Sequence, residues 1–254
     1  MKIETRVINH LKITHMEQTK LLPTAETIST FVTYNAEMNA ALKRNDIDLA
    51  NEYLRKVEAL TAEYDFFDQE FTENGLTGLK DITGKVRIPA LYKAIGDRYR
   101  YDYWRNLPVA VMNEDDKYAL AKADGSGTPL CEFVYDYIEI FPWTSHFRAH
   151  VGNKTTLLCP DGTALFPTMV DTIYEPFNHI IMLENEGKYG LCTLGGDFVA
   201  PRFDEIEPDE DNKVHVRLGD TWGYISGEGE FLPEPLSEED YDKWLYNFDP
   251  DWED

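Results

Sequence analysis

A self-similar block covers residues 75–233, and it constrains the fold more than any other feature of this sequence. The first landmark of the block is a three-residue step on an apolar strand pattern. It recurs as Thr77-Gly78-Leu79, Tyr118-Ala119-Leu120, Thr155-Thr156-Leu157, Tyr189-Gly190-Leu191 and Trp222-Gly223-Tyr224. These copies are spaced 41, 37, 34 and 33 residues apart. A period of this length is typical of repeat architectures, in which one short unit stacks on the next.

A second landmark follows the first one and shares its period. It is seen as Tyr92-Lys93-Ala94-Ile95, Tyr135-Asp136-Tyr137-Ile138, Val170-Asp171-Thr172-Ile173 and Phe203-Asp204-Glu205-Ile206. Between the two landmarks lie a glycine-containing turn and an apolar-Pro step, as in Gly196 followed by Ala200-Pro201. Glycine suits a turn with positive φ, and proline suits a strand end or edge. Each unit is therefore predicted to be a meander of three or four short antiparallel strands.

Residues 24–71 follow a helical period instead. Thr24 after Pro23 is a start signal, and Asn45 with Asp46 gives a break and a second cap. Apolar residues recur at steps of three and four, before the break at Ile28, Phe31, Met38 and Leu42 and after it at Leu49, Tyr53, Val57, Leu60, Tyr64, Phe67 and Phe71. This pattern predicts two antiparallel helices. The predicted fold class is therefore α+β, with a helical region over 1–72, β repeats over 73–233 and an acidic aromatic segment over 234–254.

The last two copies resemble the bacterial WG repeats, whose unit runs through a lysine, an aromatic, a glycine, an apolar strand, a turn, a proline and an aromatic-Asp-x-Ile step. Lys188-Tyr189-Gly190-Leu191, Pro201, Phe203-Asp204 and Ile206 match nearly every step, and Thr221-Trp222-Gly223-Tyr224-Ile225 is the other clear copy. Copies two and three carry Ala119 and Thr156 in place of the glycine, so their turns are expected to differ. The resemblance implies an all-β array, open or closed, and diverse binding or scaffold proteins without a shared catalytic motif.

The aromatic residues of the two clear copies are predicted to be structural. Trp222 and Tyr189 occupy equivalent places, and we expect both to be largely buried between units. Truncation of a large core aromatic to alanine costs about 3 to 5 kcal/mol, and this is the cost expected for each.

The charge balance is strongly acidic. The chain has 47 acidic and 24 basic residues, a net charge of −23, of which residues 73–254 carry −19. Contacts with phosphates need clustered lysine and arginine, so a nucleic-acid partner is not expected. Hydrophobic residues make up 43% of the chain, which is enough for it to fold. No segment approaches the roughly 18 apolar residues of a membrane span and no leader pattern is present, so we expect a cytoplasmic protein without a membrane partner.

Catalytic patterns are missing from the sequence. There is no GxSxG, GxGxxG or GxxxxGK[ST] motif. His146 and His150 would lie about 13 Å apart on a predicted strand, which is too far for one metal ion. Cys131, Cys159 and Cys192 form no CxxC pair and are expected to be buried free thiols in a reducing compartment. We therefore expect no enzyme, no cofactor and no metal.

Three features could bind a partner. The segment 98–105 interleaves arginines and aromatics, and it is predicted either as a binding loop or as a core strand with extended arginines. Residues 204–211 hold six acids in eight positions, and residues 234–254 hold nine acids and several aromatic anchors. The last segment is either a cap that closes the final repeat or a docking motif. The candidate partner-binding residues are Asp209, Glu210, Asp211, Trp244, Trp252, Arg98, Arg100 and Trp104.

The functional hypothesis is a non-enzymatic repeat protein that binds a basic protein partner through its acidic regions. A concrete form is an immunity or inhibitor protein that covers a toxin. Two alternatives stay open: an assembly adaptor that dimerises through the helical hairpin, and an enzyme of unrecognised type.

Overall fold

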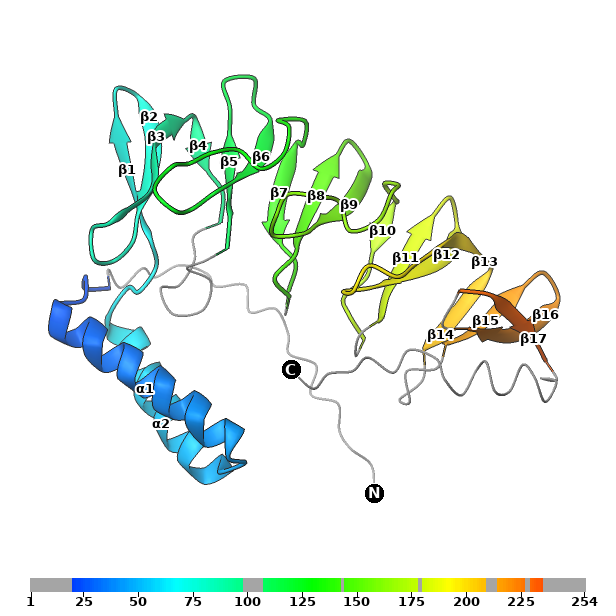
Figure 1. Ribbon diagram of the computed structural model, residues 1–254, viewed down its shortest axis with the longest axis horizontal. Coiled ribbons are helices and arrows are strands. Elements are labelled where there is room, and N and C mark those ends of the chain that lie inside the picture. Colours follow the sequence, from blue (N-terminus) through cyan, green and yellow to red (C-terminus); the bar gives the residue numbers. More distant parts are fainter. Residues whose placement is uncertain are drawn as a thin grey trace. The chain divides into compact units, whose positions relative to one another are not determined.

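The computed structural model describes residues 20–97, 107–142, 144–177, 180–208, 214–226 and 229–234. The chain divides into two compact units, with the boundary in this part of the chain between Phe67 and Asp68. The first unit contains two helices and the second contains the strands (Figure 1).

The helical unit is a hairpin of α1 (Ala25–Lys43) and α2 (Ile47–Glu63). Both predicted caps are present, because the Thr24 side chain accepts from the Thr27 amide and the Asp46 side chain accepts from the Leu49 amide, each at 3.2 Å. The predicted stripes are only partly buried: Phe31 and Val57 are buried members of them, and the other buried residues of the two helices are Asn35, Ala41 and Ala50. Two antiparallel helices were thus correctly predicted, together with the break between them.

The predicted second stripe is wrong at its end. The helix stops at Glu63, and Tyr64 takes an extended backbone with φ −116° and ψ 146°. This change of direction lets Phe66 stack on Phe31 with ring centroids 3.9 Å apart. Phe71 already belongs to a strand, and Leu42 at the end of the first stripe is exposed. The apolar steps of three and four thus continue in the sequence past the end of the helix, and Phe67 on the predicted stripe is exposed.

The described part of the second unit forms five small antiparallel sheets. In every sheet the hydrogen-bonded neighbours are consecutive in sequence, as a meander requires. The sheets are β1-β2-β3 (Gln69–Glu73, Leu76–Lys80, Val86–Tyr92), β4-β5-β6 (Ala94–Ile95, Val109–Met112, Tyr118–Ala121), β7-β8-β9 (Tyr137–Ile140, Phe147–Val151, Lys154–Leu158), β10-β11-β12-β13 (Thr172–Ile173, Ile180–Asn185, Lys188–Thr193, Phe198–Phe203) and β14-β15-β16-β17 (Glu205–Pro208, Val214–Leu218, Thr221–Ile225, Phe231–Pro233). The α+β class and the repeated β meander are therefore as predicted.

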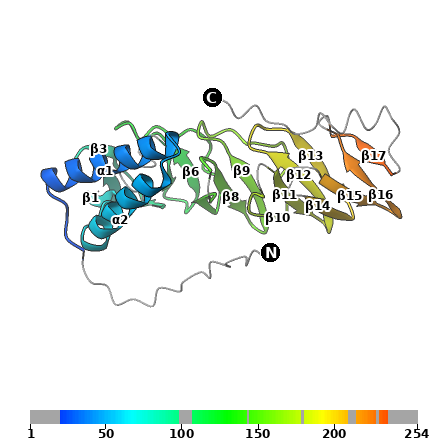
Figure 2. The same cartoon turned by 90° about the horizontal axis from the view of Figure 1, so that it is seen from below.

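Apolar residues join each sheet to the next, and the sheets follow one another in chain order (Figure 2). One cluster connects the first three sheets and a second connects the third sheet to the fourth. The third cluster places Leu191, Val199 and Phe203 of the fourth sheet against Val214 and Val216 of the fifth. Stacking of neighbouring units thus buries the apolar strands, which is the stabilising interaction of repeat proteins.

The repeated glycine has a different role from the predicted one. Gly78, Gly190 and Gly223 lie inside strands and none of them takes a positive φ. A Cβ at Gly190 would lie 2.6 Å from the Pro201 nitrogen, because β13 comes unusually close to β12 there. The register between these two strands shifts at this point, as in a β-bulge. The glycine therefore admits the last strand of a unit, and it does not shape a turn.

The two units that lack this glycine also lack that last strand among the described residues. Ala119 and Thr156 are buried in the second and third sheets, which have three strands each. Isolated bridges alone stand where a fourth strand would pair, namely Tyr118↔Tyr135 and Ala121↔Pro129 in the second unit and Thr155↔Val170 and Leu158↔Ala164 in the third. The substitutions thus coincide with a missing strand.

The landmark aromatics are less buried than predicted. Tyr189 and Trp222 are both only partly buried. The Trp222 ring stacks on His215 of the adjacent strand of its own sheet, with centroids 4.7 Å apart. The residue that follows the aromatic, Gly190 or Gly223, is buried in both copies.

Candidate partner-binding surface

The residues predicted to bind a partner lie outside the described residues, and their roles stay predictions. They are Asp209, Glu210, Asp211, Trp244, Trp252, Arg98, Arg100 and Trp104. The described strands adjoin these segments, because β14 leads into Asp209 and β17 leads into the segment from residue 235 on. The polar chemistry of the β repeats can therefore be built from the described side chains.

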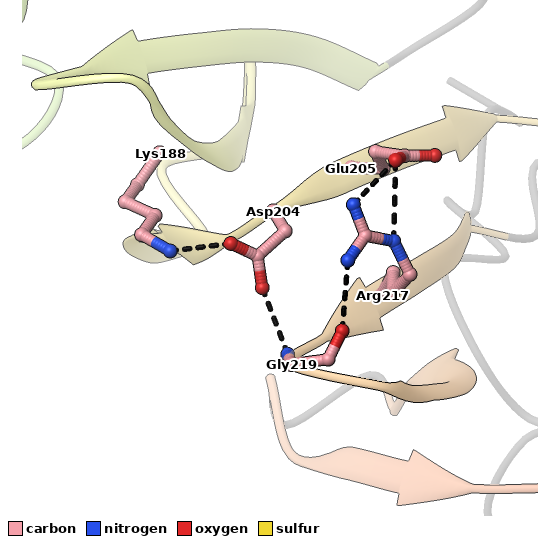
Figure 3. A network of polar contacts seen from close by, with 5 residues as sticks. All are labelled: Lys188, Asp204, Glu205, Arg217 and Gly219. Atoms are coloured by element: carbon pink, nitrogen blue, oxygen red, sulfur yellow. Dashed lines mark hydrogen bonds and ion pairs between the residues drawn. The ribbon is translucent and has the colours of Figure 1, made fainter.

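A carboxylate ties the fourth sheet to the fifth (Figure 3). Asp204 stands between β13 and β14, where the chain passes from one sheet to the next. One of its oxygens accepts from the Lys188 ammonium at the start of β12. The other accepts from the Gly219 amide in the turn between β15 and β16, at 2.8 Å. The Lys188 hydrogen bond, followed by the Gly219 amide, lowers the pKa of the Asp204 carboxyl.

The same arrangement occurs at two further junctions, and we name it the junction clip. Each clip contains a lysine at the start of the third strand of a unit or directly before it, an aspartate at the crossing and a turn amide of the following sheet. Asp136 accepts from Lys117 at 2.5 Å and from the Gly152 amide at 2.7 Å. Asp171 pairs with Lys154 at 2.7 Å and accepts from the Glu186 amide at 2.7 Å. The clips are Lys117–Asp136–Gly152, Lys154–Asp171–Glu186 and Lys188–Asp204–Gly219.

The first junction carries the opposite polarity. Lys93 takes the place of the aspartate, and Leu76 takes the place of the lysine. The Lys93 ammonium pairs with Asp116, which lies in the corresponding turn of the second sheet. The contact between crossing and turn is thus kept, while donor and acceptor are exchanged.

Ion pairs involve most of the lysine and arginine side chains among the described residues of the β unit. Seven lysine or arginine side chains of its described residues pair with a carboxylate of the same unit: Arg87–Asp68, Lys93–Asp116, Lys117–Asp136, Arg148–Glu139, Lys154–Asp171, Lys188–Asp204 and Arg217–Glu205. The Arg87–Asp68 pair is almost fully buried. Since residues 73–254 hold 35 acids against 16 bases, the excess carboxylates have no basic side chain of this unit to match them.

The fifth sheet carries a group of aromatic and charged side chains on one face. Val214 and Val216 pack against the fourth sheet, and side chains alternate along a strand, so His215 and Arg217 lie on the opposite face. The register places Glu207 and Tyr224 beside His215 and places Glu205 and Trp222 beside Arg217. We call this the outer face of the fifth sheet, formed by Glu205, Glu207, His215, Arg217, Trp222 and Tyr224.

The rings of this face are stacked. The His215 ring lies 4.7 Å from Trp222 and 4.8 Å from Tyr224, measured between centroids. Glu234, the last described residue, donates its amide to the Trp222 carbonyl at 3.0 Å and brings its carboxylate to 3.5 Å from His215 Nε2. Glu205 and Glu234 have side chains that are 48% and 42% exposed. Carboxylates thus border an aromatic surface that a partner can reach.

Burial and hydrogen bonding shift the pKa values of several nucleophilic and titratable side chains of the β unit. Burial raises the pKa of the Cys192 thiol to about 12, and burial also raises that of Cys131. All three cysteines are free, and Cys192 is fully buried. Burial lowers the pKa of His146, which just precedes β8. The hydrogen bond to Glu184 raises the pKa of Tyr174 to about 12.

The described residues contain no group of three or more histidine, cysteine or acidic side chains arranged to hold a metal ion. In the same part of the chain, neither helix combines the length and the apolar character needed to cross a membrane.

Comparisons with known proteins find distant similarity only. No protein-family model and no curated protein matches the chain. Among solved structures it is similar to the WD40 β-propeller domain of Doa1, at 11% identity over 62% of this chain and 59% of that chain, with a TM-score of 0.27. It is also similar to a streptogramin B lyase, at 13% identity over 67% of this chain and 55% of that chain, with a TM-score of 0.22. Both similarities span less than two thirds of the other chain.

Proposed function

We propose that this protein is a non-enzymatic binding protein of the WG-repeat kind, and that its β repeats recognise a basic protein partner. An immunity or inhibitor protein that covers the active site of a basic toxin is a concrete form of this function. The observation that carries the proposal is that most of the described lysines and arginines of the repeats form internal ion pairs, while residues 73–254 hold 35 acids against 16 bases.

The electrostatic argument concerns rate and partner choice. A cationic protein approaching residues 73–254 experiences long-range attraction, whereas an anionic one is repelled. The junction clips hold their carboxylates in place, so these groups contribute little to a partner. Acids outside the clips are the ones that can form new pairs, and they include the predicted residues Asp209, Glu210 and Asp211.

Purification with the full chain as bait at low salt, followed by mass spectrometry, identifies the partner. Its association rate is then measured in stopped flow at rising salt. We expect a basic partner whose association slows several-fold as the ionic strength passes about 0.15 M, where the screening length is about 8 Å. A reproducible partner with an acidic surface, or an association rate indifferent to salt, would contradict the proposal.

A second candidate is an assembly adaptor that dimerises through the helical hairpin. It is favoured by apolar side chains that the hairpin leaves exposed, among them Ile47 at 52% and Leu54 at 41%. This function predicts a dimer in light scattering that Leu54→Lys converts to a monomer. Leu91→Lys, at an exposed apolar position of β3, is the control that leaves the dimer intact. A wild-type monomer at high protein concentration removes this candidate.

A further inference from the structure

The outer face of the fifth sheet differs in surroundings from the same face of the inner sheets. In the fourth sheet, Ile181 and Leu183 face the third sheet, while Leu191 and Val199 face the fifth. Both faces of that sheet are therefore covered by neighbouring sheets. In the fifth sheet Val214 and Val216 face the fourth sheet, and no further sheet of the described residues packs on the other side.

The residues at equivalent positions change in the same way. Leu157 and Leu191, which occupy this position of the third strand in the third and fourth sheets, are fully buried. The equivalent residue of the fifth sheet is Tyr224, which is only partly buried. Tyr189 is likewise replaced by Trp222. Where the fourth sheet makes an apolar contact with its neighbour, the fifth sheet presents the large amphipathic rings of Trp222 and Tyr224. Such rings are typical of the centre of a protein interface.

Charge indicates what this surface accepts. Glu205, Glu207 and Glu234 place three carboxylates around the rings. Arg217 is the one arginine of this face, and its charge is paired within it: Nε donates to Glu205 at 3.1 Å, Nη2 donates to the same carboxylate, and Nη1 donates to the Gly219 carbonyl at 2.8 Å (Figure 3). His215 adds positive charge only when it is protonated. A cation is therefore favoured at this face, and an anion is not.

We propose that the outer face of the fifth sheet binds an arginine- or lysine-rich segment of the partner. The aliphatic stem and the cationic head of such a side chain lie against the Trp222 ring, and the head pairs with Glu207 or Glu234. A guanidinium over an aromatic ring gains cation–π attraction in addition to the ion pair. This inference rests on the proposed function and assigns that function a surface.

The test uses the full chain and a short fluorescent peptide in which arginine alternates with glycine. Peptide binding is followed by fluorescence anisotropy at fixed salt. The double variant Glu207→Gln/Glu234→Gln removes two carboxylates from the face. The matched control, Glu73→Gln/Glu114→Gln, removes two exposed carboxylates from the first two units and changes the net charge equally. We expect about tenfold weaker binding for the first variant and less than about twofold for the control.

A local readout comes from the indole signals of a ¹⁵N-labelled chain. The Trp222 signal is assigned with Trp222→Leu, and we expect it to shift during the peptide titration. Equal weakening by both double variants would mean diffuse attraction, which overturns the assigned face and leaves the basic partner in place. If residues 235–254 occupy this face instead, the Trp222 signal stays still while the peptide is added, and the inference is wrong. A chain whose natural partner is acidic contradicts the proposed function itself.

Discussion

Replacing Gly190 by alanine tests the role that the structure gives to the repeated glycine. The added Cβ would lie 2.6 Å from the Pro201 nitrogen, 2.8 Å from the Ala200 carbonyl carbon and closer still to the Val199 carbonyl oxygen. All three are backbone atoms of β13, so no side-chain rotation relieves the overlap. Carbon contacts are favourable only at about 3.5 to 4.0 Å, and β13 must move by roughly 1 Å.

The expected cost follows from what β13 supports. Val199 and Phe203 on this strand are part of the cluster that joins the fourth sheet to the fifth. Overpacking typically costs about 1 to 3 kcal/mol, and we expect the upper end of this range because a strand moves. Gly195→Ala is the matched control in the same sheet. Its Cβ would meet only the Thr193 hydroxyl at 3.5 Å, an ordinary contact, so a gain of about 0.4 to 1 kcal/mol is expected.

Urea unfolding followed by far-UV circular dichroism measures both free energies. The midpoints should separate by the equivalent of about 3 kcal/mol with little change in slope. Equal stabilities of the Gly190→Ala and Gly195→Ala chains would refute the argument that the glycine admits the last strand.

Three further predictions concern the clips, the core and the partner. Hydrogen bonds from lysines and backbone amides lower the pKa of Asp136, Asp171 and Asp204. The stability that these carboxylates contribute is therefore present above the unfolded pKa of about 3.9 and is lost as the pH falls through their folded pKa values. Urea midpoints should drop at acid pH, and the drop should be smaller in Asp204→Asn than in the control Asp115→Asn. Phe203→Ala, at a fully buried ring, should cost about 3 to 5 kcal/mol in the same assay, and Tyr189→Ala, at a partly buried one, clearly less; equal losses would show that Tyr189 is a core residue after all. Changing Asp209, Glu210 and Asp211 to lysine should lower the association rate with a basic partner, while Trp244→Ala or Trp252→Ala should mainly raise the dissociation rate. A partner that binds all these variants as tightly as the wild type would show that the acidic segments have no role in binding.

The sequence was sufficient for the repeat and the strand positions because both depend on local patterns. The first landmark falls in the third strand of the last four sheets and in the second strand of the first, and the second landmark falls at the crossing between sheets. The caps at Thr24 and Asp46 are local as well. The end of α2 was misjudged because residues at steps of three and four continue into a region where Phe66 turns back onto Phe31, a contact that spacing alone does not reveal.

Long-range contacts explain what the sequence did not show. Glycine at position 190 is needed because β13 lies close, which depends on how two strands pair. Both side chains of each clip recur at fixed places in the repeat. The lysine directly precedes the first landmark, at Lys117, Lys154 and Lys188, and the aspartate lies in the second landmark, at Asp136, Asp171 and Asp204. Their joint recurrence is a signal that could have predicted the pairs. The outer face of the fifth sheet could not be predicted from such a recurrence. It is defined by packing, because no further sheet of the described residues lies against it.

The exchanged polarity at the first junction bears on how such an array can change its number of units. If recombination removed the second unit, Lys93 would meet the turn at Gly152, which offers an amide donor in the position where Asp116 offers a carboxylate. Two donors would then face each other, and this junction would lose its ion pair. Removal of the third or the fourth unit keeps an aspartate before a turn amide, because those junctions share one polarity. The ion pair at Lys93 therefore favours the present order of the first two units, while an engineered chain shortened by one of the later units would keep the aspartate–amide contact at its new junction.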